Sequence, residues 1–175
     1  MKKIVLIVIA ISAFFATSCA QDQVTEFSND VLESKFVNAD GREVVFNEIL
    51  EQSARKTTVI DIWASWCSDC VKGLPDVKAL QKKYSKKVNF VFISYDKTHK
   101  AWQAGIEKYD IEGLHFYSKT PWKSSVFAKN INLDWIPRYM VIGKDGSIKL
   151  FKATKATDKA IEKAIKEDNT LSMSK

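Results

Sequence analysis

The chain has 175 residues, of which 46% are hydrophobic, and its 27 basic and 21 acidic residues give a formal net charge of +6. This length supplies one good hydrophobic core and is too short for two ordinary domains. The basic residues are spread among apolar residues at helical spacing, with no block of interleaved stacking aromatics, which argues against nucleic-acid binding.

The first residues are typical of an export signal. Lys2 and Lys3 form a basic start, and residues 4–16 are apolar, within the roughly 7–15 residues of a signal-peptide core. This run is shorter than the roughly 17–25 residues that a membrane-spanning helix needs. We therefore predict export, with an uncleaved anchor as the alternative.

Cys19 follows three small residues, Ala16-Thr17-Ser18, in a pattern that resembles a bacterial lipoprotein signal. Ala16 departs from the commoner Leu, and ordinary cleavage after Ala20 is the competing interpretation. We favour lipidation because Cys19 would otherwise be a stray thiol in an exported protein. Acyl chains would then hold the mature protein to a membrane surface outside the cytoplasm, in the periplasm.

The next segments alternate between strand and helix patterns. "KFVNADGREVVF" predicts a hairpin around Asp40-Gly41, because Gly tolerates the positive φ of a tight turn. Asn47 is expected to cap a short helix over residues 48–54. Residues 57–63 are apolar on both alternating faces, as in a strand covered on both sides, and Asp61 is the one interruption.

A helix is predicted to begin at a cysteine pair, Cys67 and Cys70, because apolar residues recur at helical spacing from there to Tyr84. A buried strand follows from Val88. The remaining pattern predicts, in order, a helix over 98–109, a helix from Thr120-Pro121 to about 130, a hairpin over 138–151 and a closing helix that frays beyond 167. The fold class is therefore α/β, with a mixed sheet flanked by helices.

The predicted layout has four parts. They are a lipoprotein signal peptide over 1–18, a tether over 19–34, one domain over 35–167 and a frayed tail over 168–175.

The stretch "WASWCSDC" allows a metal clip, a structural disulfide or an electron-exchanging pair. Tetrahedral zinc would need two further ligands, and His99 and His115 show no close pairing. A disulfide that closes two intervening residues restrains little of the unfolded chain. Redox exchange remains, because a thiol at a helix N-terminus faces unpaired N–H groups that favour its thiolate. We expect Cys67 to be exposed and to attack, and Cys70 to resolve the intermediate.

"VIDIWASWCSDC", the later Pro75 and the distant "WIPRYMVIGKDGSI" resemble a thioredoxin-fold protein of the membrane-tethered, extracytoplasmic TlpA/ResA-like kind, over about residues 36–167. The resemblance implies a thioredoxin-like sheet, an N-terminal hairpin and a helical insertion over 98–130. It also implies a cis peptide at Ile136-Pro137 against the cysteine pair. Substrate would bind at Trp66, Ile136 and Pro137, where an extended segment pairs with the backbone before the proline.

Asp61 matches the buried acid of thioredoxins themselves, which exchanges a proton with the second cysteine. The alternative is that Asp61 has only a structural role, as a cap or a salt-bridge partner at the end of a strand. Two positions depart from many tethered relatives: Asp69 stands where Pro is common, and Gly73 stands where some carry a carboxylate. Trp63 is expected to pack under the site, and Trp102, Trp122 and Trp135 to pack in the core or the insertion.

These features predict an extracytoplasmic thiol-disulfide oxidoreductase that reduces disulfides of exported proteins. No cofactor is expected beyond the Cys67–Cys70 disulfide. The expected partners are cysteine-containing exported proteins, an extracytoplasmic or membrane electron donor and the membrane surface. The alternative from another class is a thioredoxin-fold binding module, or a chaperone for metal or haem-protein maturation, that uses the cysteines only to hold a partner.

Overall fold

The computed structural model describes residues 24–84 and 86–171. The predicted signal peptide and Cys19 lie outside the described residues. Within the described residues, no helix combines the length and the apolar character needed to cross a bilayer.

Seven strands form one mixed sheet in the order β2-β1-β5-β4-β3-β6-β7. The central strands β3, β4 and β5 are parallel, and the other neighbours are antiparallel. The strand bounds are β1 Lys35–Asn38, β2 Glu43–Val45, β3 Thr57–Trp63, β4 Val88–Ser94, β5 Leu114–Tyr117, β6 Arg138–Ile142 and β7 Ile148–Ala153.

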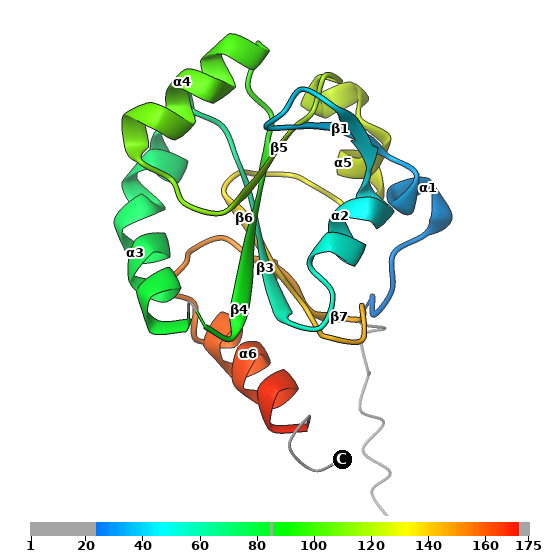
Figure 1. The fold of residues 1–175 in the computed structure, drawn as a ribbon, viewed down its shortest axis with the longest axis vertical. Coiled ribbons are helices and arrows are strands. Elements are labelled where there is room, and N and C mark those ends of the chain that lie inside the picture. The colour runs from blue at the N-terminus through cyan, green and yellow to red at the C-terminus, as the bar shows by residue number, and fades with distance from the viewer. Residues whose placement is uncertain (1–23, 85, 172–175) are drawn as a thin grey trace, which may run out of the picture.

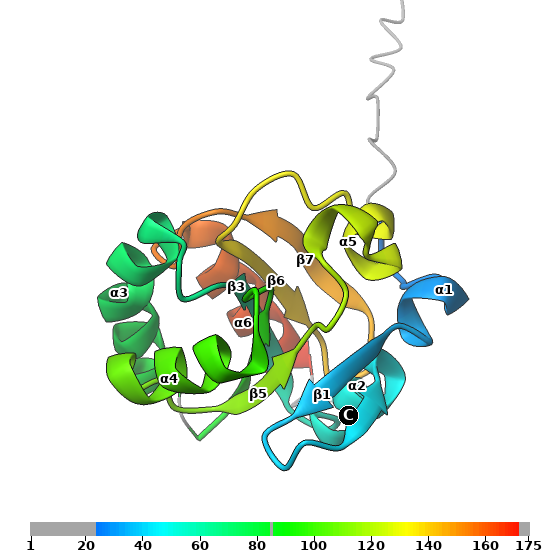
Figure 2. The same cartoon turned by 90° about the horizontal axis from the view of Figure 1, so that it is seen from above.

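Helices cover both faces of this sheet. They are α1 Asn29–Leu32, α2 Phe46–Gln52, α3 Ser68–Tyr84, α4 His99–Tyr109, the 3-10 helix η1 Trp122–Ser124, α5 Val126–Asn130 and α6 Lys159–Leu171. α3, α4 and α6 lie on one face, and α1, α2 and α5 lie on the other (Figures 1 and 2). α3 and α4 share a face because each is a crossover between parallel strands that advance in the same direction across the sheet. The predicted fold class is confirmed.

The most regular predicted elements lie where the sequence placed them. β3 has the predicted bounds and is buried along its whole length. α4 begins directly after Thr98, whose side chain accepts a hydrogen bond from the Ala101 N–H. The hairpin between β1 and β2 turns at Gly41, with φ of 83°. In each case the signal is local, so the sequence pattern was sufficient.

Two local predictions were wrong, and one strand was not predicted. α2 begins at Phe46, not after Asn47, because Val45 is the N-cap and its N–H donates to the Glu48 carboxylate at 3.2 Å. The single helix expected from residue 120 is split, and Ser125 caps its second part by accepting from the Ala128 N–H. β5 was not predicted, because four residues are too few to show a clear period.

Both predicted domain boundaries also need correction. Residues 25–34 do not form a free tether: the Thr25 carbonyl accepts a hydrogen bond from the Ile148 N–H at 2.7 Å, and the Phe27 ring packs on Phe46. At the other end, α6 continues through residues 168–171. Asp168 is buried there and accepts a 2.6 Å hydrogen bond from the Thr57 hydroxyl, which holds the last turn to β3.

Candidate active site

The cysteine pair sits where β3 leads into α3. Cys67 and Cys70 form a disulfide with their Cα atoms 5.3 Å apart. The Cys67 carbonyl accepts the Val71 N–H, so Cys67 occupies the N-cap position of the helix. Its Sγ accepts the Cys70 N–H at 3.2 Å, as the side-chain oxygen of an ordinary N-cap does. The same N–H would favour a Cys67 thiolate after reduction.

Burial corrects one expectation. Cys67 is only 7% exposed, so it is not the open thiol that the sequence predicted, while Cys70 is 2% exposed. Access is nevertheless unequal, because Cys67 lines a surface cavity of about 230 Å³ that Cys70 does not line.

A cis peptide bond joins Ile136 to Pro137 at the entry to β6. The Ile136 carbonyl oxygen lies 3.5 Å from the Cys67 Sγ. The structure therefore brings together Cys67, Cys70, Ile136 and Pro137, four of the predicted site residues, from two segments about 70 residues apart.

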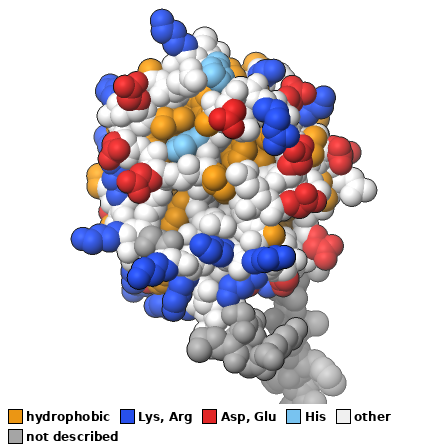
Figure 3. Space-filling model, in the orientation of Figure 1, with side chains coloured by type: hydrophobic (Ala, Val, Ile, Leu, Met, Phe, Trp, Pro, Cys, Tyr) orange, Lys and Arg blue, Asp and Glu red, His pale blue; other side chains and the backbone are white. Residues whose placement is uncertain are grey.

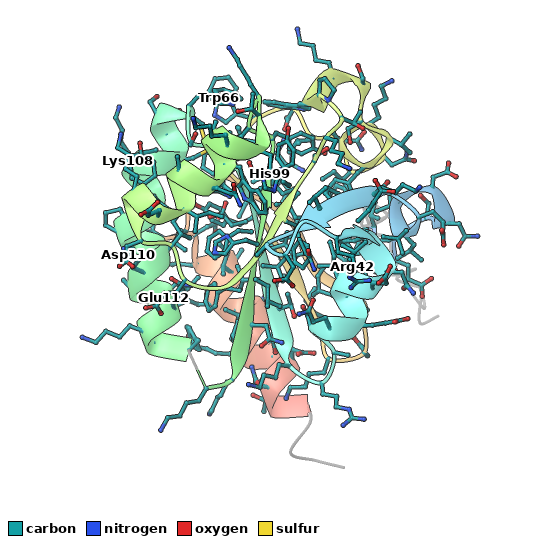
Figure 4. The ribbon with its side chains drawn as sticks, turned by 45° about the horizontal axis from the view of Figure 1, so that its top comes forward. Arg42, Trp66, His99, Lys108, Asp110 and Glu112 are labelled. Atoms are coloured by element: carbon teal, nitrogen blue, oxygen red, sulfur yellow. A yellow bond between two sulfur atoms is a disulfide. The ribbon has the colours of Figure 1, made fainter. Side chains whose placement is uncertain are left out.

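Three tryptophans surround the reactive sulfur. Trp66, Trp122 and Trp135 line the same 230 Å³ cavity as Cys67. Trp66 is 52% exposed and Trp135 is 59% exposed. Figure 4 shows Trp66 at the upper end of the molecule. The expectation that Trp135 packs in the core or the insertion was therefore wrong, whereas Trp122 packs against the core as predicted and also lines the cavity. The sequence held one signal that Trp135 belongs to the site, because Trp135 directly precedes Ile136-Pro137. By contrast, Trp63 and Trp102 are buried, as predicted.

The loop before the cis peptide is held from inside by Arg138. This side chain is fully buried, and its guanidinium donates to the carbonyls of Ile131 and Asn132 at 3.2 and 3.0 Å and to the carboxylate of Asp134. Hydrogen bonds from Lys152 and Arg138 hold the pKa of Asp134 at about 2. Sequence reasoning missed Arg138, because a basic residue in a strand gives no sign that it is buried.

The loop between β3 and α3 has its own support. Asp96, which is buried beyond the end of β4, accepts hydrogen bonds from the backbone N–H and the hydroxyl of Ser65. The Cys67 N–H donates to the Ala64 carbonyl at 3.0 Å. These contacts fix the backbone that presents Cys67.

Asp61 lies within β3 and is 3% exposed. Its Oδ1 has no hydrogen-bond partner among the residues that the structure describes. Burial raises the pKa of this carboxyl from 3.8 to about 8, because the charged form would lose its hydration. At neutral pH Asp61 is mostly protonated and can exchange a proton near physiological conditions.

The two histidines pack within the fold. His115 is buried, with Nε2 2.9 Å from the Ile111 carbonyl oxygen and its ring stacked on Phe92. His99 contacts the rings of Trp102 and Tyr117 edge-on. Within residues 24–84 and 86–171, no group of three or more His, Cys, Asp or Glu side chains is arranged to hold a metal ion.

A profile of the family described as thioredoxin-like matches residues 55–148, more than half of the chain. Thioredoxin-like protein HCF164 of Arabidopsis thaliana, a chloroplast protein, is 37% identical over 62 residues, which are 35% of this chain and 23% of that protein. The chain thus spans less than a quarter of the plant relative that it matches. Thioredoxin-like protein YneN of Bacillus subtilis is 26% identical over 126 residues, 68% of this chain and 69% of that protein.

Among solved structures, this chain resembles the solution structure of a candidate thiol-disulfide oxidoreductase from Bacteroides vulgatus. The TM-score is 0.62 at 29% identity, and the match covers 79% of this chain and 85% of that one.

Proposed function

The chain belongs to the thioredoxin-like family. From this premise we propose that it is a thiol-disulfide oxidoreductase that reduces disulfides of exported proteins outside the cytoplasm. The observation that carries the proposal is the Cys67–Cys70 disulfide at the start of α3, with its first sulfur against the carbonyl before a cis-proline.

The proposed exchange uses these groups in the following order. In the reduced protein, the Cys67 thiolate attacks a substrate disulfide, forms a mixed disulfide and releases one substrate thiolate, which takes a proton from water. Asp61 in its carboxylate form then takes the proton of Cys70, and the Cys70 sulfur attacks the Cys67 sulfur, which closes the internal disulfide and releases the second substrate thiolate. Two electrons pass to the substrate. A dithiol donor restores the reduced pair by the reverse sequence, in which Asp61 returns the proton to Cys70.

The neighbouring groups support binding of an extended substrate segment. The backbone at Ile136 can pair with such a segment, as in recognition by strand addition. Trp66 and Trp135 offer exposed rings beside the sulfur, which suit apolar side chains that flank a substrate cysteine.

We propose the reducing direction because the strand acid Asp61 and the tethered-class pattern resemble those of reducing members of the family, while proton exchange at Asp61 serves both directions. A buried acid that is protonated at neutral pH can return a proton to Cys70 when a donor opens the disulfide, and can accept it when the pair attacks a substrate. We further propose that the partner which reloads the pair is a membrane or extracytoplasmic dithiol protein.

Two features support a lipid anchor on a membrane. The basic and apolar start of the chain precedes Cys19 and its small neighbours. The end of the domain opposite Cys67 is also basic: Arg55 and Lys56 precede β3, Lys86 and Lys87 precede β4, and parallel pairing places these segments at one edge. Figure 3 shows Lys and Arg gathered at this lower end. Such a surface favours an anionic membrane and leaves Cys67 facing away from it.

The experiment is an equilibrium titration of the Cys67/Cys70 pair in redox buffers, combined with a disulfide-reduction assay on a model protein. We expect a potential nearer to about −270 mV than to about −120 mV and reductase activity that Cys67→Ser abolishes. A potential near the oxidising value would reverse the proposed direction. Suppose that the wild type reduces no disulfide, and that the wild type and Cys67→Ser capture the same partner proteins. The chain is then a binding module instead.

A further inference from the structure

Tyr139 on β6 lies directly opposite Asp61 on β3 in the antiparallel register. Directly opposed residues project their side chains from the same face of a sheet. Both residues are buried, with exposed fractions of 1% for Tyr139 and 3% for Asp61. Within the described part of the chain, the Tyr139 Oη and the Asp61 Oδ1 both lack a hydrogen-bond partner. Buried polar atoms without hydrogen-bond partners are uncommon, so two such atoms on residues that face each other across neighbouring strands need an explanation.

The Tyr139 hydroxyl also reaches the helix that begins at the cysteines. A Cβ atom built on Gly73 would lie 3.5 Å from the Tyr139 Oη. Gly73 follows Cys70 by three residues, about one helical turn, and its missing side chain leaves space above the phenol. The hydroxyl is thus placed between Asp61 and the first turns of α3.

A surface cavity of about 350 Å³ borders the Tyr139 side chain. Tyr139, Pro137 and Gly73 form part of its wall, and the exposed Lys72 and Asp76 on α3 connect it to solvent. A cavity of this size with polar walls can hold several water molecules. Asp61 is therefore opposite a residue whose side chain borders this cavity.

We propose that Tyr139 is a positioning residue for proton transfer at the redox site, with its hydroxyl linking the Asp61 carboxyl to water in this cavity. When Asp61 releases a proton, a bridging water passes it to the phenol oxygen while the phenol proton leaves to the cavity side. Tyr139 ends neutral, as it began, and one proton has moved from the carboxyl to solvent. The inference rests on the proposed function, because it concerns the proton that Asp61 exchanges with Cys70.

The charges around the phenol keep it in its neutral, donating form. Burial raises the pKa of Tyr139 far above its ordinary value, and the negative charges of Asp61 and Asp76 act in the same direction. The other charged groups that line the cavity are Asp69 and Lys72 on α3 and Lys155 in the connection between β7 and α6. On the other side of Asp61, β4 contributes the uncharged Phe92.

The test is Tyr139→Phe in the full chain, which removes one oxygen and keeps the ring. The Asp61 titration is followed in the oxidised protein by the infrared carboxyl band, and the rate of reduction by a small dithiol is measured against pH. Loss of the phenol that holds the bridging water against the carboxylate should raise the Asp61 midpoint by about one pH unit. Loss of the proton route should slow reduction at pH 7 by roughly 10-fold.

Two further variants make the test specific. Tyr84→Phe is the matched control, because it removes a phenol oxygen at the far end of α3, about 20 Å along the helix from Cys70, and should change neither readout. In an Asp61→Asn background, Tyr139→Phe should cause no additional loss of rate, since the group that it serves is gone. If Tyr139→Phe does not fold, Gly73→Ala is the second variant. Its added methyl group would approach the Tyr139 hydroxyl oxygen from the helix and should raise the Asp61 midpoint.

An unchanged midpoint and rate in Tyr139→Phe would overturn the proposal, and so would an equal loss of rate with and without Asp61. If the wild-type pair exchanges with no disulfide, the proposed function fails instead. The carboxyl titration in the oxidised protein still tests the link between Tyr139 and Asp61 in that case, because it requires no turnover.

Discussion

The Sγ atom of Cys67 lies 3.5 Å from the carbonyl oxygen of Ile136, although the two residues are 69 positions apart in the chain. The cis peptide at Pro137 follows this carbonyl directly. The two segments therefore form one surface, in which a bound substrate backbone would run beside the attacking sulfur. Cys70 lies behind this surface at 2% exposure.

The unequal access of the two sulfurs predicts the order of the exchange. Cys70→Ala should accumulate reductant-sensitive adducts with cysteine-containing exported proteins, because the mixed disulfide on Cys67 then has no resolving thiol. Cys67→Ala should accumulate few, since Cys70 does not line the cavity. Non-reducing gels show the difference, with the double Ala variant as the control. Adducts on Cys67→Ala alone would reverse the two roles.

Asp61→Asn should change how stability depends on pH. The native carboxyl holds its proton up to a pKa of about 8, whereas the unfolded carboxyl loses it near 3.8. The wild-type free energy of unfolding should therefore fall by up to about 1.4 kcal/mol per pH unit as the pH rises from about 4 to about 8. The variant lacks this loss and should be roughly 2–4 kcal/mol more stable at pH 7, while exchanging thiols more slowly.

Urea unfolding of the oxidised proteins at pH 5, 7 and 8.5 measures this difference. We expect the two stabilities to diverge between pH 5 and 8 and to run parallel above that range. A variant that is less stable at pH 8 and fully active would show that Asp61 has a structural role only.

Arg138→Lys should disturb the loop that carries Trp135 and Ile136. Lysine keeps the charge but cannot donate to two carbonyls and a carboxylate at once, so a buried charge is left poorly paired. We expect a loss of about 2–4 kcal/mol in the free energy of unfolding and a raised KM in the reduction assay. Lys152→Met removes the exposed partner of Asp134 and should cost less than about 1 kcal/mol. Equal, small effects of both variants would contradict this role of Arg138.

Trp135→Ala should weaken substrate binding without weakening the fold. The side chain is 59% exposed beside Cys67, so its removal leaves no internal cavity and should change stability by no more than about 0.5 kcal/mol. KM for a protein substrate should rise several-fold, while the rate with a small dithiol stays the same. Val126→Ala truncates another exposed apolar residue, 51% accessible, and provides the control. An unchanged KM would remove Trp135 from the binding surface.

Cys19→Ala should release the protein from the membrane fraction and leave the redox activity of the domain intact. Lipidation is the proposed reason for the small residues before Cys19. Mass spectrometry of the mature N-terminus tests the proposal directly. A terminus at Gln21 without an acyl chain would show ordinary cleavage after Ala20.

The sequence alone determined the elements whose signal lies within a short window. Apolar residues on both faces predicted β3, the local pattern over residues 98–109 predicted α4, and the spacing of Cys67 and Cys70 at a helix start predicted the redox pair. In each case one segment records its own burial or capping, so no distant residue is needed to interpret it.

Only the tertiary structure decided which side chains meet. The contacts of Asp168 with Thr57 and of Arg138 with the loop before Pro137, and the pairing of Tyr139 with Asp61, join elements that no local period connects. The exposure of a side chain was also decided by the tertiary structure. Trp102 is buried and Trp135 is exposed, although each tryptophan has a polar neighbour in the sequence. Periodicity reports that a residue has a buried face, whereas the order of strands in the sheet and the packing of helices on it determine what that face contacts.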